Sequence, residues 1–393
     1  MDDPIPDSRA ILADLIAFPT ISRSGNRALV DYVRAVVALA GARVVLTDDG
    51  ADANMWISVG PEGVPGVVLS GHSDVVPVAG QAWTRDPFVL TAHDGRLYGR
   101  GTADMKGFVA SALRALLIAA RRPLRTPLHL AISFDEEIGC VGVRSLLPLL
   151  AALPVRPWLV WIGEPTGLAL ASGHKGKAAF RVTATGRAAH SALPTQGLNA
   201  IHLAADVIGV LRAVQADLIA RTVPHPAYDV GYSTIHVGTI RAGEALNIVP
   251  ATCTLDFEIR DLPGEDVPAI VADIAARAEA IIAPWQRRFP EAAITIAPIN
   301  AYPGLDTRHP GALAFARAVS GYNGPDCKLA FGTEGGLFAQ TLGVPAIICG
   351  PGSMDQGHKP DEFITADQLA RCDAMLARLI DRLEAGLAVP MQD

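Results

Sequence analysis

Val67-Val68-Leu69-Ser70-Gly71-His72-Ser73-Asp74 is the stretch that decides the fold, because a short apolar run ends there in a histidine and an acid. Apolar runs at 128–134, 158–162 and 344–349 are similar, and each leads into a loop with glycine or acidic residues. Residues 106–122, between the first two runs, carry apolar side chains at helical spacing. Short apolar runs that alternate with helices are typical of buried strands in an α/β sheet. The sequence therefore predicts an α/β domain.

The middle of the chain predicts a different order of elements. Four strands and two helices follow one another as β-α-β-β-α-β, which is the ferredoxin-like arrangement. We infer a small domain at 178–300, inserted into a larger α/β domain that is formed by 1–177 and 301–393. The expected elements of the inserted domain span residues 178–185, 199–220, 233–240, 252–260, 265–288 and 292–299.

The bulk composition narrows the class of protein. The chain has 393 residues, of which 50% are apolar, so two or three domains with a large core are expected. The formal net charge is −7 and no basic block stands out, which argues against a nucleic-acid partner. No apolar stretch reaches the roughly 18 residues that span a membrane, so we expect no membrane partner.

The cysteines indicate a reducing compartment. They are odd in number and widely scattered, so neither a disulfide framework nor a CxxC metal site fits. The acidic start at residues 1–4 also lacks the basic residues and apolar run of a signal peptide. We therefore expect a cytoplasmic protein with reduced thiols. The cysteines are Cys140, Cys253, Cys327, Cys349 and Cys372.

Acidic and histidine residues follow the predicted strands. In open α/β sheets, ligands bind beyond the carboxyl ends of the strands. Carboxylates and imidazoles that converge on one edge would repel one another, and a divalent metal relieves that conflict. Histidine and carboxylate ligands without cysteine suit zinc, cobalt or manganese at a catalytic site. The candidate residues are His72, Asp74, Asp104, Glu136, Glu137, Glu164 and His358.

Each candidate has a simpler explanation when it is taken alone. Asp104 precedes a predicted helix and would serve as its N-cap. Glu136 and Glu137 would be a solvated loop pair, and His190 and His358 would be turn or surface histidines. Taken together, these explanations require every strand end to carry an acid or a histidine by chance. A metal site is therefore the favoured interpretation.

These motifs resemble those of the aminoacylase and carboxypeptidase-type dinuclear zinc peptidase family. Within it the chain is most similar to the acetylornithine deacetylases, and it is also similar to the succinyl-diaminopimelate desuccinylases. The resemblance implies a zinc-peptidase-like, three-layer α/β catalytic domain with an inserted ferredoxin-like α+β lid and dimerisation domain. The matching stretches, in family order, are residues 71–77, 97–107, 135–139, 162–166, 174–176, 186–191, 247–250 and 357–363.

The resemblance also implies a set of metal ligands. His72 and Glu164 would hold one ion, Glu137 and His358 would hold the other, and Asp104 would bridge the two. The family usually has a cis peptide bond after the bridging aspartate. The implied cofactor is two Zn²⁺ per subunit, for which Co²⁺ can substitute.

Catalytic roles follow from the same resemblance. Asp74 would orient the ring of His72, as a carboxylate behind a metal ligand does. Metal ions lower the pKa of a water, and Glu136 would act as the general base that takes its proton. His190 would donate a hydrogen bond to the developing oxyanion. Because that histidine comes from the partner subunit in the family, a homodimer is implied.

The resemblance suggests an N-acyl amino acid as substrate, with N2-acetyl-L-ornithine as the favoured compound. Asn247 and Arg260 would bind its carboxylate, because a guanidinium offers a bidentate fork. Lys175 is a weaker candidate, and Glu334 would receive a substrate ammonium. A desuccinylase-like or other deacylase, a metallo-dipeptidase and a non-catalytic metal-binding protein remain the alternatives. The acyl specificity stays open, because the chain departs from the family pattern at Ala103, Gly336 and Gly357.

Overall fold

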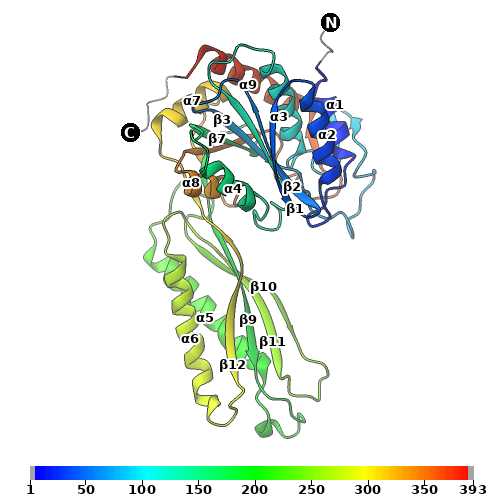
Figure 1. The fold of residues 1–393 in the computed structure, drawn as a ribbon. Helices are drawn as coiled ribbons and strands as arrows, with labels where there is room; N and C mark the ends of the chain where they lie inside the picture. Colours follow the sequence, from blue (N-terminus) through cyan, green and yellow to red (C-terminus); the bar gives the residue numbers. More distant parts are fainter. Residues whose placement is uncertain (1–4, 388–393) are drawn as a thin grey trace. The chain divides into compact units, whose positions relative to one another are not determined.

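The computed structural model describes residues 5–387, so the acidic start at residues 1–4 lies outside it. The chain divides into two compact units (Figure 1). The first contains Met1–Gly173, Leu305–Lys328 and Thr333–Asp393, and the second contains His174–Gly304 and Leu329–Gly332. The second unit therefore interrupts the first along the chain.

The first unit is built on a nine-stranded mixed sheet in the order β1-β2-β6-β3-β7-β15-β8-β13, with β14 paired to β8. The four neighbours β6, β3, β7 and β15 run parallel, whereas β1, β2 and β8 pair antiparallel. The carboxyl ends of the four parallel strands therefore meet at one edge. The strands span Arg43–Asp49 (β1), Asp52–Val59 (β2), Val67–His72 (β3), Leu128–Ser133 (β6), Leu159–Pro165 (β7), Ala171–His174 (β8), Leu305–Asp306 (β13), Cys327–Leu329 (β14) and Ala346–Gly350 (β15).

Helices cover both faces of this sheet, so the unit has three layers. Alternate strand residues, such as Leu69, Leu130 and Trp161, share one buried cluster with α1, α2, α3, α7 and α9. The opposite face packs against α4 and α8, which contact β2, β7 and β15. The predicted three-layer α/β architecture is confirmed. The helices span Ser8–Ile16 (α1), Arg27–Ala38 (α2), Lys106–Ala119 (α3), Val143–Ala151 (α4), Pro310–Ser320 (α7), Gly335–Leu342 (α8) and Ala366–Ala385 (α9).

The first unit also contains a small three-stranded sheet, in which the strands pair in the order β16-β5-β4. Its strands are Thr91–His93 (β4), Arg96–Tyr98 (β5) and Phe363–Thr365 (β16). Helix α9 follows β16 directly, and the side chain of Thr365 caps it by accepting from the backbone N–H of Gln368 at 3.1 Å. This sheet joins the segment before Asp104 to the segment after His358.

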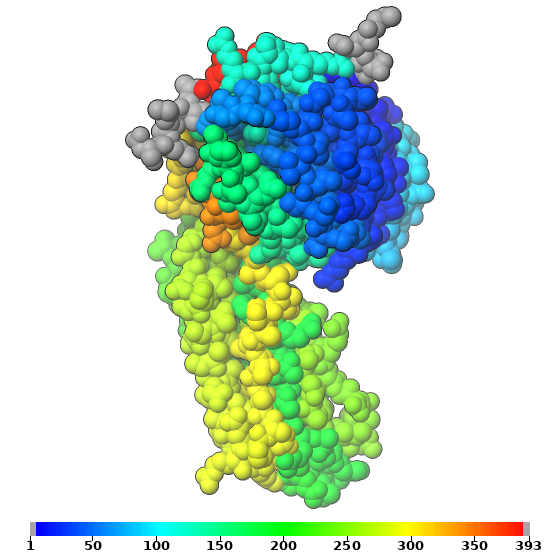
Figure 2. Space-filling model, in the orientation of Figure 1, coloured from blue at the N-terminus to red at the C-terminus, as the bar shows by residue number. Residues whose placement is uncertain are grey.

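The second unit is a four-stranded antiparallel sheet in the order β10-β11-β9-β12. Helices α5 and α6 bury apolar side chains against the sheet, including Val182, Leu255 and Phe257. Figure 2 shows α6 in yellow-green along one side of this unit. The elements follow the order β-α-β-β-α-β, apart from a 3-10 turn at Pro194–Gln196. They are Lys177–Thr185 (β9), Ala200–Arg221 (α5), Thr234–Ala242 (β10), Thr252–Arg260 (β11), Val267–Gln286 (α6) and Ala293–Tyr302 (β12).

Among residues 5–387, no helix combines the length and the apolar character that a membrane span requires.

Candidate metal centre

Three neighbouring strand ends bring acids and a histidine together. His72 is the last residue of β3 and pairs in register with Ser133, the last residue of β6. Glu136 and Glu137 follow β6 within four residues of that end, and Glu164 lies near the end of β7. Because these strands are parallel neighbours, their side chains meet at the same edge of the sheet.

The carboxylate of Asp104 lies between two histidines. Its Oδ1 is 3.2 Å from Nε2 of His72, and its Oδ2 is 3.1 Å from Nε2 of His358. Asp104 is only 5% exposed. One carboxylate with a different imidazole at each oxygen has the arrangement that a bridging ligand requires.

Two further carboxylates complete the cluster, one near each histidine. The carboxylate of Glu137 lies 2.9 Å from Nε2 of His358, and that of Glu164 lies 3.9 Å from Nε2 of His72. Candidate ligand atoms of His72, Asp104 and Glu137 lie within 4.8 Å of one another, as do those of His72, Glu136 and Glu164. The structure thus brings together all five residues that the sequence predicted as metal ligands.

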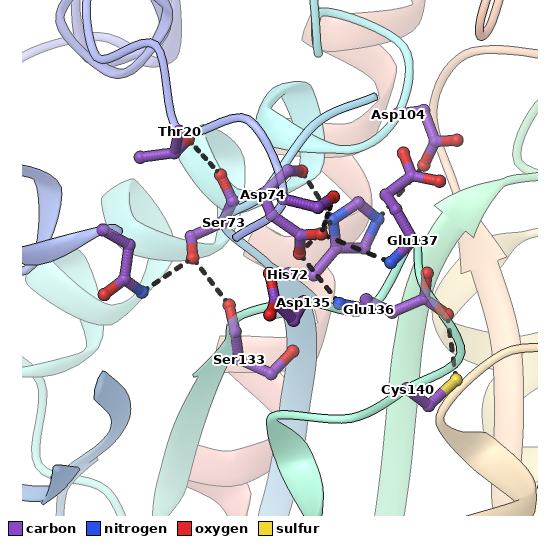
Figure 3. A network of polar contacts seen from close by, with 12 residues as sticks. Thr20, His72, Ser73, Asp74, Asp104, Ser133, Asp135, Glu136, Glu137 and Cys140 are labelled. Carbon is purple, nitrogen blue, oxygen red and sulfur yellow. Dashed lines mark hydrogen bonds and ion pairs between the residues drawn. The ribbon is translucent and has the colours of Figure 1, made fainter. Parts of the chain in front are cut away.

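The loop that carries Asp104 rules out the simpler explanation for this residue. The N-cap position of α3 belongs to Met105, and no side chain caps the helix there. The carboxylate of Asp104 instead points to the histidines, as Figure 3 shows for His72. The peptide bond Asp104–Met105 is cis, as the resemblance implied.

Asp74 contacts both His72 and the loop of the two glutamates. Nδ1 of His72 donates to the backbone carbonyl of Asp74 at 2.9 Å, while the Asp74 carboxylate lies farther away at 3.5 Å. A donor at Nδ1 leaves the lone pair of the His72 ring on Nε2, which faces the cluster. The Asp74 carboxylate accepts from the backbone N–H groups of Glu136 at 3.0 Å and Glu137 at 3.3 Å (Figure 3). Asp74 therefore holds the loop of the two glutamates.

Cys140 is a residue of the site that the sequence did not single out. Its thiol donates to Oε1 of Glu136 at 3.2 Å (Figure 3), and it is 1% exposed. Burial raises the pKa of the Cys140 thiol well above its usual value, and the negative charge of Glu136 adds to this effect. The thiol therefore keeps its proton and remains a donor. The only sequence signal was its position four residues after Glu136.

The ionisation of the cluster favours added positive charge. Burial raises the pKa of Glu136 to about 8 and that of Glu137 to about 7, and neighbouring carboxylates contribute to both shifts. Burial also raises the pKa of Glu164 well above its usual value. Contacts with Asp104 and Glu137 raise the pKa of His358 to about 10. Without a cation, these groups retain protons that a divalent ion would replace.

The donor set fits a pair of divalent cations. It contains imidazole nitrogens and carboxylate oxygens without thiolate, which suits zinc, cobalt or manganese. Cys140 does not belong to this set, because its sulfur faces Glu136 rather than the histidines. Five side chains for two ions leave open positions for water and substrate, as catalytic sites require.

The remaining candidate in this unit, Glu334, is buried. It immediately precedes α8, is 2% exposed, and accepts at 3.2 Å from the hydroxyl of Ser70 in β3. Burial raises its pKa to about 7 against the opposing contacts with Ser133 and His72. Its partner Ser70 lies two residues before His72 in β3, so Glu334 is held near the cluster.

Four candidates lie in the second unit. His190 is exposed, and its Nδ1 accepts from the backbone N–H of Ala192 at 3.1 Å. Asn247 is exposed as well, and its backbone carbonyl accepts from Ser191. Arg260 donates to Glu258 at 2.9 Å and to the hydroxyl of Tyr302 at 3.1 Å. Lys175 is 2% exposed, and its ammonium donates to the backbone carbonyl of Tyr232 at 2.7 Å.

The fold and the cluster define a hydrolase of the metallopeptidase class, which acts on amide bonds. The chain belongs to peptidase family M20/M25/M40, whose sequence profile matches residues 68–382. The family is metal-dependent, and the cluster supplies the candidate ligands.

Two curated relatives are named acetylornithine deacetylase. The chain is 31% identical over 390 residues to the acetylornithine deacetylase of Pasteurella multocida, covering 97% of this chain and 99% of the relative. It is 37% identical over 312 residues to the acetylornithine deacetylase of Salmonella arizonae, covering 79% and 78%.

Solved structures support the fold. An M20 family metallo-carboxypeptidase from Sulfolobus solfataricus superposes with a TM-score of 0.78 at 18% identity, over 97% of this chain and all of that one. A dinuclear metal-binding M20 peptidase from Bacillus subtilis superposes with a TM-score of 0.70 at 14% identity, over 95% and 96%.

Proposed function

We propose that the protein is a dinuclear zinc amidohydrolase that removes the acetyl group from N2-acetyl-L-ornithine, giving L-ornithine and acetate in the cytoplasm. The observation that carries this proposal is the carboxylate of Asp104, each oxygen of which faces a different histidine. Two relatives named acetylornithine deacetylase, matched over 99% and 78% of their lengths, support the substrate.

In this proposal the ligands divide as the resemblance implies. His72 and Glu164 would hold one Zn²⁺, Glu137 and His358 would hold the other, and Asp104 would be shared. Bound divalent cations supply Lewis acidity that polarises the amide carbonyl and makes a water nucleophilic near neutral pH. Co²⁺ suits the same ligands.

Glu136 moves the proton. Its backbone N–H donates to Asp74, and an oxygen of its carboxylate lies within 4.8 Å of candidate ligand atoms of His72 and Glu164. It takes the proton of the attacking water and delivers it to the departing amine. Burial supports this role, because a pKa raised toward neutrality lets one carboxylate both accept and release a proton.

The second unit would complete the site from the partner subunit. His190 would donate to the oxyanion, and Arg260 and Asn247 would bind the substrate carboxylate, with Lys175 as a further cation. The exposure of His190 and Asn247 supports a role in which they meet a second surface. Glu334 would balance the substrate ammonium; Glu334→Gln should then impair hydrolysis of cationic more than of neutral N-acetyl amino acids, and equal losses would exclude this role.

A substrate panel tests the proposal. N2-acetyl-L-ornithine, other N-acetyl, N-formyl and N-succinyl amino acids and dipeptides would be assayed with added zinc or cobalt, and released acetate would be quantified. We expect acetylornithine to give the highest kcat/KM. Preferred release of amino acids from dipeptides would identify a dipeptidase instead.

A pair of variants tests the role of the base. Glu136→Gln should lower kcat by about 10²–10⁴-fold while the metal content stays at the wild-type level. Glu62→Gln is the matched control, because Glu62 is 77% exposed and contacts only a surface arginine, Arg43. An active Glu136→Gln enzyme would exclude Glu136 as the base, and a wild-type protein that binds metal without hydrolysing any substrate would support a non-catalytic protein.

A further inference from the structure

A buried carboxylate outside the ligand set holds the loop of Asp104. Glu362 lies four residues after His358, directly before β16, and is 1% exposed. Its Oε1 accepts from three backbone N–H groups of the Asp104 loop: Gly101 at 3.1 Å, Ala103 at 2.9 Å and Asp104 itself at 3.1 Å. The position of the Asp104 backbone is therefore set by Glu362.

The other oxygen of Glu362 connects this loop to the loop of His358. Oε2 accepts from Nη1 of Arg100 at 2.6 Å, and Arg100 is also 1% exposed. Nη2 of Arg100 donates to Oε1 of Gln81 at 2.5 Å, and Nε2 of Gln81 donates to the backbone carbonyl of His358 at 2.9 Å. Arg100 also reaches the carbonyl of Lys359 at 3.3 Å. One continuous network thus links the backbones of two metal-ligand candidates.

The conformation of the His358 loop makes such support necessary. His358 has a φ of +62°, a left-handed conformation that a non-glycine residue keeps only when its surroundings impose it. No helix or strand contains Asp104 or His358, so contacts between loops must fix their separation.

Stability alone is a poor explanation for this pair. Replacing a buried ion pair by apolar side chains is often neutral or stabilising, because both charges lose their hydration. Here Glu362 accepts from backbone N–H groups of the Asp104 loop, and Arg100 donates to the carbonyl of Lys359 beside His358. Charge-assisted hydrogen bonds of this kind fix geometry strongly. Residues behind metal ligands commonly tune the affinity for the metal in this way.

We propose that Arg100 and Glu362 form a positioning pair that holds Asp104 and His358 at the separation required for divalent cations. This inference rests on the proposed dinuclear function. The pair touches neither the cations nor the substrate, and it acts through the backbone of the two ligand loops.

Cobalt binding tests the proposal on the full-length protein. Glu362→Gln removes the charge and turns an amide N–H₂ group toward Arg100, while the side chain keeps its size. We expect about 10–100-fold weaker Co²⁺ binding, measured by chelator competition, together with a changed visible absorption spectrum of the bound Co²⁺. Asp361→Asn is the matched control, because this partly buried neighbour accepts from the backbone N–H and hydroxyl of Thr84 rather than from the Asp104 loop, so affinity and spectrum should stay at wild-type values.

A second variant keeps the test decisive if a single buried charge prevents folding. Arg100→Gln with Glu362→Gln removes both charges at once and should still bind Co²⁺ more weakly than the wild type. Wild-type affinity and spectrum in either variant, with an unchanged thermal unfolding curve, would overturn the proposal. Failure of the wild-type protein to bind Co²⁺ or to hydrolyse any N-acyl amino acid would instead contradict the proposed function.

Discussion

Glu136 and Glu137 are neighbours in the chain, yet their side chains meet different partners. The carboxylate of Glu137 contacts the ring of His358, whereas the carboxylate of Glu136 accepts a hydrogen bond from the thiol of Cys140. The sequence predicted different roles for the two glutamates from the resemblance to a family. It gave no sign of the thiol, because a cysteine four residues away reveals its partner only after the loop has folded.

Cys140 gives a first prediction. Its φ is +53°, a backbone conformation that glycine adopts without strain and that disfavours a residue with a side chain. Removing the donor with Cys140→Ala should lower kcat by roughly fivefold to thirtyfold, since the lost hydrogen bond to the carboxylate contributes about 1–2 kcal/mol. Cys140→Ser should recover part of the loss. Metal content, measured by elemental analysis, should stay constant; an unchanged kcat in Cys140→Ala would show that the contact is incidental.

His129 gives a second prediction, on pH and stability. Burial lowers its pKa to about 4, and the positive charge of Arg43 contributes. Between pH 6.5 and 4 the unfolded chain therefore binds a proton that the folded protein does not, so stability falls as the pH falls through this window. The loss reaches about 1.4 kcal/mol per pH unit and at most about 3 kcal/mol in total.

The measurement compares the free energy of unfolding of the wild type with that of His129→Phe as a function of pH. The ring of His129 stacks on that of Trp56, with the ring centroids 4.6 Å apart. His129→Phe keeps a ring at this position, but the new ring cannot bind a proton. The advantage in unfolding free energy that the wild type has over this variant should shrink as the pH falls from 6.5 to 4. His93→Phe, at an exposed position, controls for the change of side chain. A difference that stays constant over this range would rule out the buried neutral histidine.

At the scale of elements, close packing of α3 on β7 positions a ligand. A Cβ added at Gly163 would lie 1.9 Å from the ring of Phe108, which is fully buried in α3. Gly163→Ala should therefore push α3 and β7 apart and destabilise the protein by about 1–3 kcal/mol. Because Glu164 is the next residue, metal affinity should fall as well.

A second glycine provides a control, because its replacement by alanine should stabilise the protein rather than destabilise it. Gly209 lies within α5, and a Cβ there would meet no atom within 4 Å. Gly209→Ala should stabilise the protein by about 0.5–1 kcal/mol, because alanine favours the helix. Urea unfolding of both variants checks the pair, and equal effects of the two substitutions would contradict the packing argument.

The elements also show what a sequence can predict. The apolar runs that lead into His72 and Glu164 correctly indicated buried strands of an α/β sheet, because two buried faces leave a continuous apolar signal. The helix expected at 106–122 ends earlier, at Ala119, since the chain turns before Pro123. Short strands such as β4 and β16 span three residues each and carry no such periodicity. Their pairing, and with it the environment of Glu362, depends on contacts distant in sequence.

At the scale of the whole molecule, the position of His190 decides how many chains make one site. The proposed dimer places His190 of one subunit at the cluster of the other, and mixing two inactive variants tests this directly. Glu136→Gln lacks the base, and His190→Ala lacks the oxyanion donor. In a mixed dimer one site regains both groups only if His190 acts across the interface.

The expected activity follows from symmetry. Random reassortment of two variants in equal amounts gives half mixed dimers, each with one complete site of two, so about a quarter of wild-type activity should return. If His190 acts within its own chain, every site lacks one group and no activity returns. Mixing must include a step that separates and reassembles subunits, with sedimentation to verify the dimer. A monomer that is fully active would contradict the shared site, and His190 would then have to reach the cluster of its own chain.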